Sequence, residues 1–519
     1  MFIKIALLAA FFAITIIVGL VFRKRSTSVS GFVLGGRSIG PWLTAFAYGT
    51  SYFSAVVFVG YAGQFGWRFG ISALWIGLGN AFIGCLLAWV VLARRTRLVT
   101  HRLNSATMPD FFGARYGSSG LKIGASIITF IFLVPYTASL YNGLSRLFSM
   151  AFDIDFTLCI VAMAILTAVY VIAGGYTATA VNDFIQGIIM LVGIVAVIAA
   201  VLRVNGGFTG SLEALARVTD EGVSSTPGVF ASIFGPDPFS LLGVVLLTSV
   251  GTWGLPQMVQ KFYSIKAEKN ISTGTVVSTV FAVVISGGCY FLGGFGRLFD
   301  SPAMRSESGA MIYDAVIPEM LSGFAPLLIG IVVVLVLAAS ISTLSSLVMA
   351  SASTFTLDFL KTGFVKNMSD KTQLLTIRAL VAVFIAISGV IAAVQYKGGV
   401  SFIAQLMGVS WGALAGAFLA PFLYGLYWKR VTKPAVWVNF IFATAFMLAN
   451  IFFRGSFPAV LQSPINAGAF TMLFGLVLVP VISLVTKKPD SALVEKCFEC
   501  YNQTVAVRAA ESLGVTEEG

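Results

Sequence analysis

Long apolar runs alternate with short polar segments along almost the whole chain. About thirteen of these runs reach the length of roughly 20 residues that a helix needs to cross a bilayer. Because a backbone inside lipid must satisfy its own hydrogen bonds, the pattern predicts an all-α polytopic membrane protein with about 13 transmembrane helices. The predicted spans lie at about residues 3–22, 41–67, 71–93, 121–149, 156–173, 180–202, 238–260, 272–296, 325–357, 374–395, 400–427, 434–453 and 466–486.

Two of the predicted spans contain residues that interrupt a helix. The second span includes the stretch Ala47–Ala55, with further glycines beyond it, and the seventh includes Gly251–Gln257. Pro256 lacks an amide hydrogen and glycine permits unwinding, so these residues either kink the two helices or break them inside the membrane. Two broken helices five spans apart fit the first members of two inverted five-helix repeats, here helices 2–6 and 7–11.

The span at 325–357 carries a row of hydroxyl groups. Ser342, Ser345, Ser346 and Ser353 share one face at helical spacing. Hydroxyl and carbonyl oxygens are ligands for a small hard cation. The alternative is that these side chains bond back to carbonyls of their own helix, or allow neighbouring helices to approach closely.

Composition and charge agree with a membrane protein and orient it. Hydrophobic residues make up 58% of the chain and charged residues 10%, which excludes a soluble enzyme. The charges of Arg23–Arg25 follow the first apolar run, which predicts an uncleaved helix with the N-terminus outside. Alternation then places most of the 33 Lys and Arg residues on the cytoplasmic side, including Arg94–Arg102, Lys261 and Lys266. The net charge of +12 therefore indicates topology rather than nucleic-acid binding.

The order of spans and loops predicts how the chain is divided. An N-terminal helix and a cytoplasmic loop occupy residues 1–40, the first repeat 41–203, an extracellular loop 204–237, the second repeat 238–427, two further helices 428–487 and a cytoplasmic tail 488–519. The tail holds Cys497 and Cys500, whose spacing alone is weak evidence for metal binding or redox chemistry.

No motif in the sequence supports an enzymatic reaction. Gly408-Val-Ser410-Trp-Gly412 matches a nucleophile-elbow pattern, but it lies inside a predicted span with no strand before it. The single histidine, His101, lies in a predicted cytoplasmic loop and cannot act as the base. The protein is predicted not to be an enzyme.

Several motifs together resemble the sodium:solute symporter family. They are Gly174-Gly-Tyr with Ala180-Val-Asn-Asp183-Phe-Ile-Gln186-Gly, Gly35-Gly-Arg-Ser38, and Gly425-Leu-Tyr-Trp428-Lys-Arg430. The resemblance covers about residues 1–485, and the motifs are most similar to those of the proline and pantothenate symporters. It implies the LeuT-type inverted-repeat fold, in agreement with the two interrupted helices, and sodium as the coupling ion.

The resemblance also implies a main sodium site between broken helix 2 and helix 9. Thr50, Phe53 and Ala339 would supply backbone carbonyls, and Ser342 and Thr343 would supply hydroxyls.

Some family members hold a second sodium ion, which implies a second ligand set here. Asp183 with Ser342, Ser345 and Ser346 would form it. Asp183 near the inner end of its span is either such a ligand, a proton carrier, or only a cap of the helix N-terminus.

The solute would lie close to the sodium sites. Tyr136 on helix 4 matches a substrate-site tyrosine of the proline-type symporters, and Trp253, Gln257, Gln405 and Trp411 are further candidates. Aromatic side chains in membrane helices often serve packing instead. Sugar-transporting members carry polar side chains where this chain has Val56 and Val57, which disfavours a sugar.

The combined prediction is sodium-coupled uptake of a small organic solute across the cell membrane by alternating access. The solute would be an amino acid such as proline, or a carboxylate such as pantothenate. A proton-coupled transporter or exchanger on the same fold is one alternative, and a non-transporting sensor or channel is another. The expected partners are the solute and the lipid bilayer, and one copy of the chain is sufficient.

Overall fold

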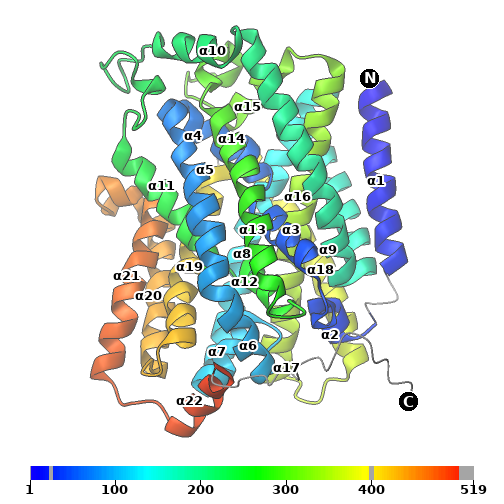
Figure 1. The fold of residues 1–519 in the computed structure, drawn as a ribbon, viewed down its shortest axis with the longest axis vertical. Helices are drawn as coiled ribbons and strands as arrows, with labels where there is room; N and C mark the ends of the chain where they lie inside the picture. The colour runs from blue at the N-terminus through cyan, green and yellow to red at the C-terminus, as the bar shows by residue number, and fades with distance from the viewer. Residues whose placement is uncertain (1, 23–26, 397–402, 502–519) are drawn as a thin grey trace, which may run out of the picture.

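The protein is a bundle of helices that run roughly side by side (Figure 1). A computed structural model describes residues 2–22, 27–396 and 403–501, and within these ranges it contains helices but no β-strand. The long helices are α1 (Phe2–Phe22), α8 (Ser119–Phe152), α9 (Phe156–Val204), α16 (Pro326–Thr354), α18 (Asp370–Tyr396), α19 (Ile403–Tyr427), α20 (Lys433–Phe452) and α21 (Pro464–Val485). Arg23–Arg25, the first residues of the predicted span at 400–427, and the tail beyond residue 501 lie outside the described residues.

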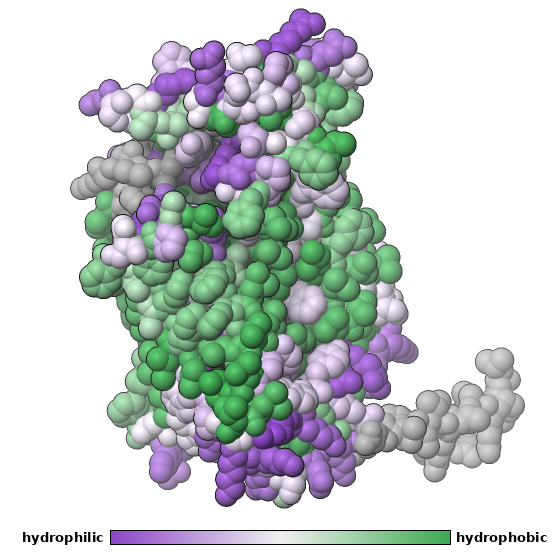
Figure 2. Space-filling view, turned by 90° about the vertical axis from the view of Figure 1, so that its left-hand side faces the viewer, coloured by the Kyte–Doolittle hydropathy of each residue, from purple (hydrophilic) through white to green (hydrophobic). Residues whose placement is uncertain are grey.

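An apolar belt surrounds the bundle. The face shown in Figure 2 is hydrophobic across its middle and hydrophilic at both ends. Large apolar side chains point outward from this belt; Val192 of α9 is 66% exposed and Ile441 of α20 is 61% exposed. Such a surface is stable against lipid rather than water. The predicted class, an all-α polytopic membrane protein, is confirmed.

The described residues contain ten or eleven candidate membrane spans. Ten helices among the described residues are long and apolar enough to cross a membrane, and a bent pair makes eleven. Two of the ten runs contain 47 and 48 residues, more than twice what one span requires. The total of thirteen, and the division of the chain into repeats and loops, stay predictions.

Helix α9 shows how one of these long runs is divided. Gly175 has φ 60° and ψ −167°, a conformation that is essentially restricted to glycine, and it bends the helix sharply. Lys4 near the N-terminus donates to the carbonyl of Ala151, just before α9 begins. Helix α10 (Gly207–Ala216), which follows α9, lies at the same end of the molecule as the N-terminus (Figure 1). Both ends of α9 therefore lie on one side, and the chain reverses near Gly175, between the predicted spans 156–173 and 180–202.

Both predicted helix breaks are present. Helix α3 (Pro41–Tyr52) ends before Phe53 and Ser54, which are not helical, and the chain continues in the π-helical segment η3 (Val56–Tyr61) and in α4 (Ala62–Phe69). In the seventh span, α11 (Pro238–Val250) and the 3₁₀ turn η8 (Gly251–Gly254) are bent by 45° against α12 (Pro256–Tyr263). Pro256 begins α12, where its missing amide hydrogen costs no helical hydrogen bond. These breaks expose backbone carbonyls in the middle of the bundle.

The C-terminal helix α22 (Ser491–Phe498) contacts the rest of the protein beside α6 (Arg94–Arg102) and α7 (Met108–Tyr116). Cys497 and Cys500 are both buried, and Cys500 Sγ donates to the carbonyl of Cys497 at 3.3 Å. Burial raises the pKa of both thiols, which disfavours the thiolate that metal binding and redox chemistry require. The pair contributes to packing of the tail.

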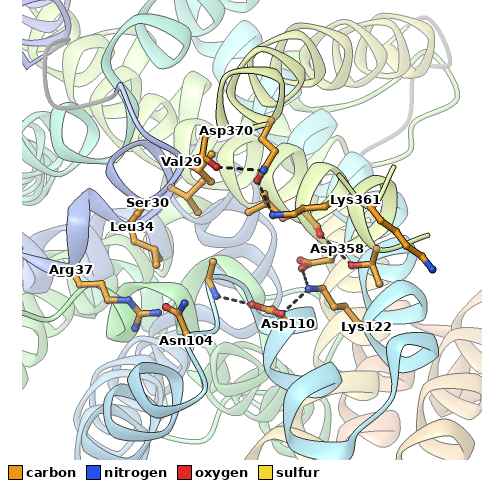
Figure 3. Close-up of a pocket in the computed structure, with 16 residues that line it drawn as sticks. Val29, Ser30, Leu34, Arg37, Asn104, Asp110, Lys122, Asp358, Lys361 and Asp370 are labelled. Carbon is orange, nitrogen blue, oxygen red and sulfur yellow. Dashed lines mark hydrogen bonds and ion pairs between the residues drawn. The ribbon is translucent and has the colours of Figure 1, made fainter. Parts of the chain in front are cut away.

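A polar pocket of about 540 Å³ is lined by residues of several segments, including Asp110 of α7 and Lys122 of α8 (Figure 3). Within it, Lys122 of α8 lies between two carboxylates, with its Nζ 2.7 Å from Asp110 Oδ1 and 3.3 Å from Asp358 Oδ1. Asp358 belongs to η13 (Phe355–Leu360), is buried, and also accepts a hydrogen bond from Thr107. This ion-pair network joins α7, α8 and the end of the helix that begins as α16.

Lys122→Met should destabilise the protein by about 3 kcal/mol, because removing one partner leaves the buried Asp358 carboxylate without its cation. Thermal unfolding in detergent measures the effect. Lys366→Met is the matched control, since Lys366 lines the same pocket but is exposed. Equal losses in the two variants would contradict a structural role for the Lys122 network.

Candidate functional site

Four of the five predicted main-site residues place oxygen atoms within hydrogen-bonding distance of one another. Ser342 Oγ lies 3.0 Å from the carbonyl oxygen of Thr50 and 3.0 Å from that of Ala339. Thr343 Oγ1 lies 3.1 Å from the Thr50 oxygen and 3.0 Å from the Ala339 oxygen. All four residues are buried. The end of α3 and the middle of α16 thus share a small cluster of oxygens.

Phe53, the fifth predicted residue, is the first residue after α3. Its amide donates to the carbonyl of Gly49, and it lines a small cavity together with Ala339 and Leu335. The helix break therefore places Phe53 beside Ala339.

This oxygen cluster has the chemistry that a sodium ion requires. Two carbonyls and two hydroxyls offer neutral oxygen ligands, and a hydroxyl that now donates to a carbonyl can turn its hydrogen away from a cation. The serines that share one face of α16 do not all contribute to this oxygen cluster, however. Ser345 donates to the carbonyl of Ser342 at 2.8 Å, and Ser353 donates to that of Met349 at 2.6 Å, so both bond back to their own helix.

A second polar cluster lies one turn further along α16. Ser346 Oγ is 2.8 Å from Ser51 Oγ and accepts a hydrogen bond of 2.9 Å from Lys261 Nζ. Lys261 Nζ also lies 3.9 Å from Asp183 Oδ2. Asp183 and Lys261 are both buried, at 0% and 2% exposure. Asp183, Ser346 and a buried ammonium group thus occupy the region of the predicted second sodium site.

Lys261 is a residue that sequence reasoning misses. Its position just after the predicted span 238–260 suggests a cytoplasmic loop, but the structure places it within α12 and buries it. The available signal is local: Lys261 stands in the short helix that follows Pro256, among otherwise uncharged residues. The assignment of Lys261 to a loop is corrected.

An aromatic cluster lies next to the helix break. The ring of Trp411 from α19 is 5.9 Å from that of Tyr136 on α8 and 6.0 Å from that of Tyr52 on α3, and Tyr52 stacks on Phe53 at 4.3 Å. Tyr136 is 0% exposed and Trp411 1% exposed. The Tyr136 hydroxyl faces the Ser54 and Trp411 side chains, but neither this hydroxyl nor the Trp411 indole nitrogen makes a hydrogen bond of normal length and angle among the described residues. Buried unpaired polar atoms beside aromatic faces are suited to contact a small solute.

The other three predicted solute residues lie in different surroundings. Gln257 lines a cavity with Lys261 and Ser346, and its buried side-chain amide has no partner within the described parts of the chain. Trp253 Nε1 already donates to the carbonyl of Ile83 at 3.1 Å. Gln405 is half-buried near the start of α19. Their roles stay predictions.

Comparison with known proteins decides the family. A model of the sodium:solute symporter family matches residues 32–443. The chain belongs to the sodium:solute symporter family. This confirms the resemblance seen in the motifs, with sodium-coupled transport of a small-molecule solute across the cell membrane as its function, sodium as the coupling ion, and no enzymatic reaction.

Two relatives of the sodium:solute symporter described here are proline transporters. The osmoregulated proline transporter OpuE of Bacillus subtilis (strain 168) is 29% identical over 496 residues, which cover 93% of this chain and 95% of that protein. A sodium/proline symporter of Staphylococcus aureus is 30% identical over 437 residues, which cover 82% of this chain and 81% of that protein.

A solved structure shows the same fold. It is that of a Na⁺-coupled sialic acid symporter in a substrate-bound outward-open state, with a TM-score of 0.72, 16% identity, and coverage of 94% of this chain and 99% of that one. This structural similarity confirms the predicted LeuT-type fold with its two broken helices.

Proposed function

We propose that this symporter moves proline, or a compact amino acid of similar size, into the cell together with sodium bound between the break after α3 and the middle of α16. The observation that carries the proposal is the cluster of four oxygens from Thr50, Ala339, Ser342 and Thr343. The solute would lie against the Tyr136 and Trp411 rings. The proline relatives support this class of solute, and the buried apolar Val56 and Val57 just after the break offer no groups to bind sugar hydroxyls.

The aromatic cluster supplies a direct route for coupling. Thr50 contributes to the ion cluster, and Tyr52, two residues later, contacts Trp411 in the proposed solute pocket. Sodium binding would order the end of α3 and thereby position Tyr52, so each ligand favours binding of the other. Because the coupling free energy is shared, the solute raises the affinity for sodium by the same factor by which sodium raises the affinity for the solute.

The expected orientation places the N-terminus outside and the C-terminus in the cytoplasm. A membrane potential of about 100 mV then supplies roughly 2.3 kcal/mol for each charge moved inward, and a tenfold sodium gradient adds about 1.4 kcal/mol. One sodium ion per cycle would therefore support accumulation of a neutral solute on the order of 500-fold.

Uptake into proteoliposomes tests this proposal. We expect an inward sodium gradient to drive uptake of labelled proline, an inside-negative potential to increase it, and excess unlabelled glucose to leave it unchanged. Pantothenate in a parallel competition assay separates the two candidate solutes. Uptake driven by a proton gradient in sodium-free buffer would contradict sodium coupling, and sodium-driven uptake of pantothenate without proline would contradict the solute.

A further inference from the structure

We propose that the ammonium group of Lys261 permanently takes the place of a second sodium ion, so that this symporter carries one sodium ion per solute. The inference rests on the proposed main sodium site, and it assigns the neighbouring cluster to a cation that belongs to the protein. It replaces the prediction of a second sodium ion bound by Asp183, Ser342, Ser345 and Ser346.

The surroundings of Lys261 are those of a bound cation. Its Nζ donates to Ser346 Oγ at 2.9 Å, lies 3.9 Å from Asp183 Oδ2, and lies 5.2 Å from the centroid of the Tyr176 ring. A hydroxyl oxygen, a carboxylate and an aromatic face all attract positive charge. The side chain reaches the cluster from α12, the short half of the seventh span.

Charge balance argues against a sodium ion at the same place. Asp183 has no hydrogen-bond donor to either carboxylate oxygen within the described residues, and Lys261 is the cation recorded beside it. A buried carboxylate is stable when one opposite charge compensates it. Adding sodium would place two positive charges against one negative charge in a region shielded from water, where their repulsion is weakly screened.

The space and the oxygens available lead to the same conclusion. The cavity that Lys261 lines with Gln257 and Ser346 measures about 10 Å³, close to the least volume that holds one water molecule. Ser346 Oγ already accepts a hydrogen bond from the Lys261 ammonium group and lies 2.8 Å from Ser51 Oγ. The ammonium group therefore occupies the position beside Ser346 and Asp183 that an additional ion would need.

A tethered cation has a mechanical consequence. Lys261 links α12 to α16 through Ser346, and Ser346 links onward to Ser51 in α3. Both broken spans are thus joined to α16 beside the main site, without an ion that must bind and leave in each cycle. The free energy for accumulating the solute would then come from one sodium ion per transport cycle.

Counting sodium on the purified wild-type protein is the first test. We expect equilibrium binding of radioactive sodium to saturate at one ion per chain, and the reversal potential of solute-coupled current to give one charge per neutral solute. Two ions per chain, or two charges per solute, would overturn the inference. This measurement needs no variant and so does not depend on whether a variant folds.

Removing the ammonium group is the second test. Lys261→Met keeps the length of the side chain and leaves the Asp183 carboxylate without its cation, so we expect a second sodium ion to bind and the sodium Hill coefficient to rise from about 1 towards 2. The double variant Lys261→Met with Asp183→Asn removes both charges and should return to one ion. Lys266→Met makes the same charge change at an exposed site just beyond α12 and should match the wild type.

Failure of the inference differs from failure of the proposed function. A folded Lys261→Met protein that still binds one sodium ion overturns the role of Lys261 while leaving the main site intact. Wild-type protein that binds no sodium, and transports equally well without it, contradicts the main site and the inference together.

Discussion

Replacing Ser342 with alanine should raise the sodium concentration for half-maximal uptake by about tenfold or more, and Thr343→Ala should do the same. Each substitution removes one of four converging oxygens, and losing a hydrogen-bonding or ligand group of this kind costs about 1.4 kcal/mol or more, which corresponds to a factor of ten. Initial rates of solute uptake, measured over a range of sodium concentrations in proteoliposomes, give the value directly. The maximal rate at saturating sodium should fall much less.

Two companion variants separate loss of a ligand from general damage to α16. Ser340 is buried on the same helix, but its hydroxyl donates at 2.7 Å to the carbonyl of Val336, within its own helix. Ser340→Ala should therefore leave sodium dependence unchanged. Thr343→Ser keeps the hydroxyl and should lie close to the wild type. If Ser340→Ala shifts sodium dependence as far as Ser342→Ala, the oxygen cluster is not the ion site.

The broken helices show what the sequence alone could reveal about the fold. Long apolar runs predict membrane spans, and Pro256 with the glycines before it predicts a kink or a break in the seventh span. The break near Phe53 was predictable for a similar reason, since small and polar residues surround it. Once the breaks were expected, the carbonyl of Thr50 and the hydroxyls of Ser342 and Thr343 could be assigned together by resemblance, and they do meet in the structure.

Lys261 shows where such reasoning fails. Its charge and its place at the end of an apolar run are those of a loop residue, and only the packing of α12 against α3, α6 and α16 reveals that it is buried beside Asp183. The same limit applies to Gln257 and Trp253. The bend between η8 and α12 sets which way each side chain points, and helical spacing cannot predict the direction of a break. Gln257 consequently lines the small cavity that Lys261 also lines, and Trp253 Nε1 donates a hydrogen bond to the carbonyl of Ile83.

Tyr136→Ala should weaken solute affinity by at least about tenfold while leaving sodium-induced thermal stabilisation largely intact. The ring contacts Trp411, and truncating a buried aromatic side chain that touches a ligand removes both contact area and shape. Tyr136→Phe removes only the hydroxyl, which is buried beside Ser54 and Trp411 and makes no hydrogen bond of normal geometry among the described residues, so we expect a smaller loss of affinity in this variant.

Tyr141→Phe supplies the matched control for this prediction. Tyr141 is also a buried tyrosine of α8, and its hydroxyl interacts with Thr167. A step of five residues turns the side chain about 140° around the helix, so Tyr141 points away from the face that carries Tyr136. Melting temperatures measured with sodium alone, and then with sodium plus proline, report the two ligands separately. Normal proline affinity in Tyr136→Ala would exclude the Tyr136 and Trp411 cluster as the solute pocket, whereas equal losses in Tyr136→Phe and Tyr141→Phe would mean that the hydroxyls act through the packing of α8.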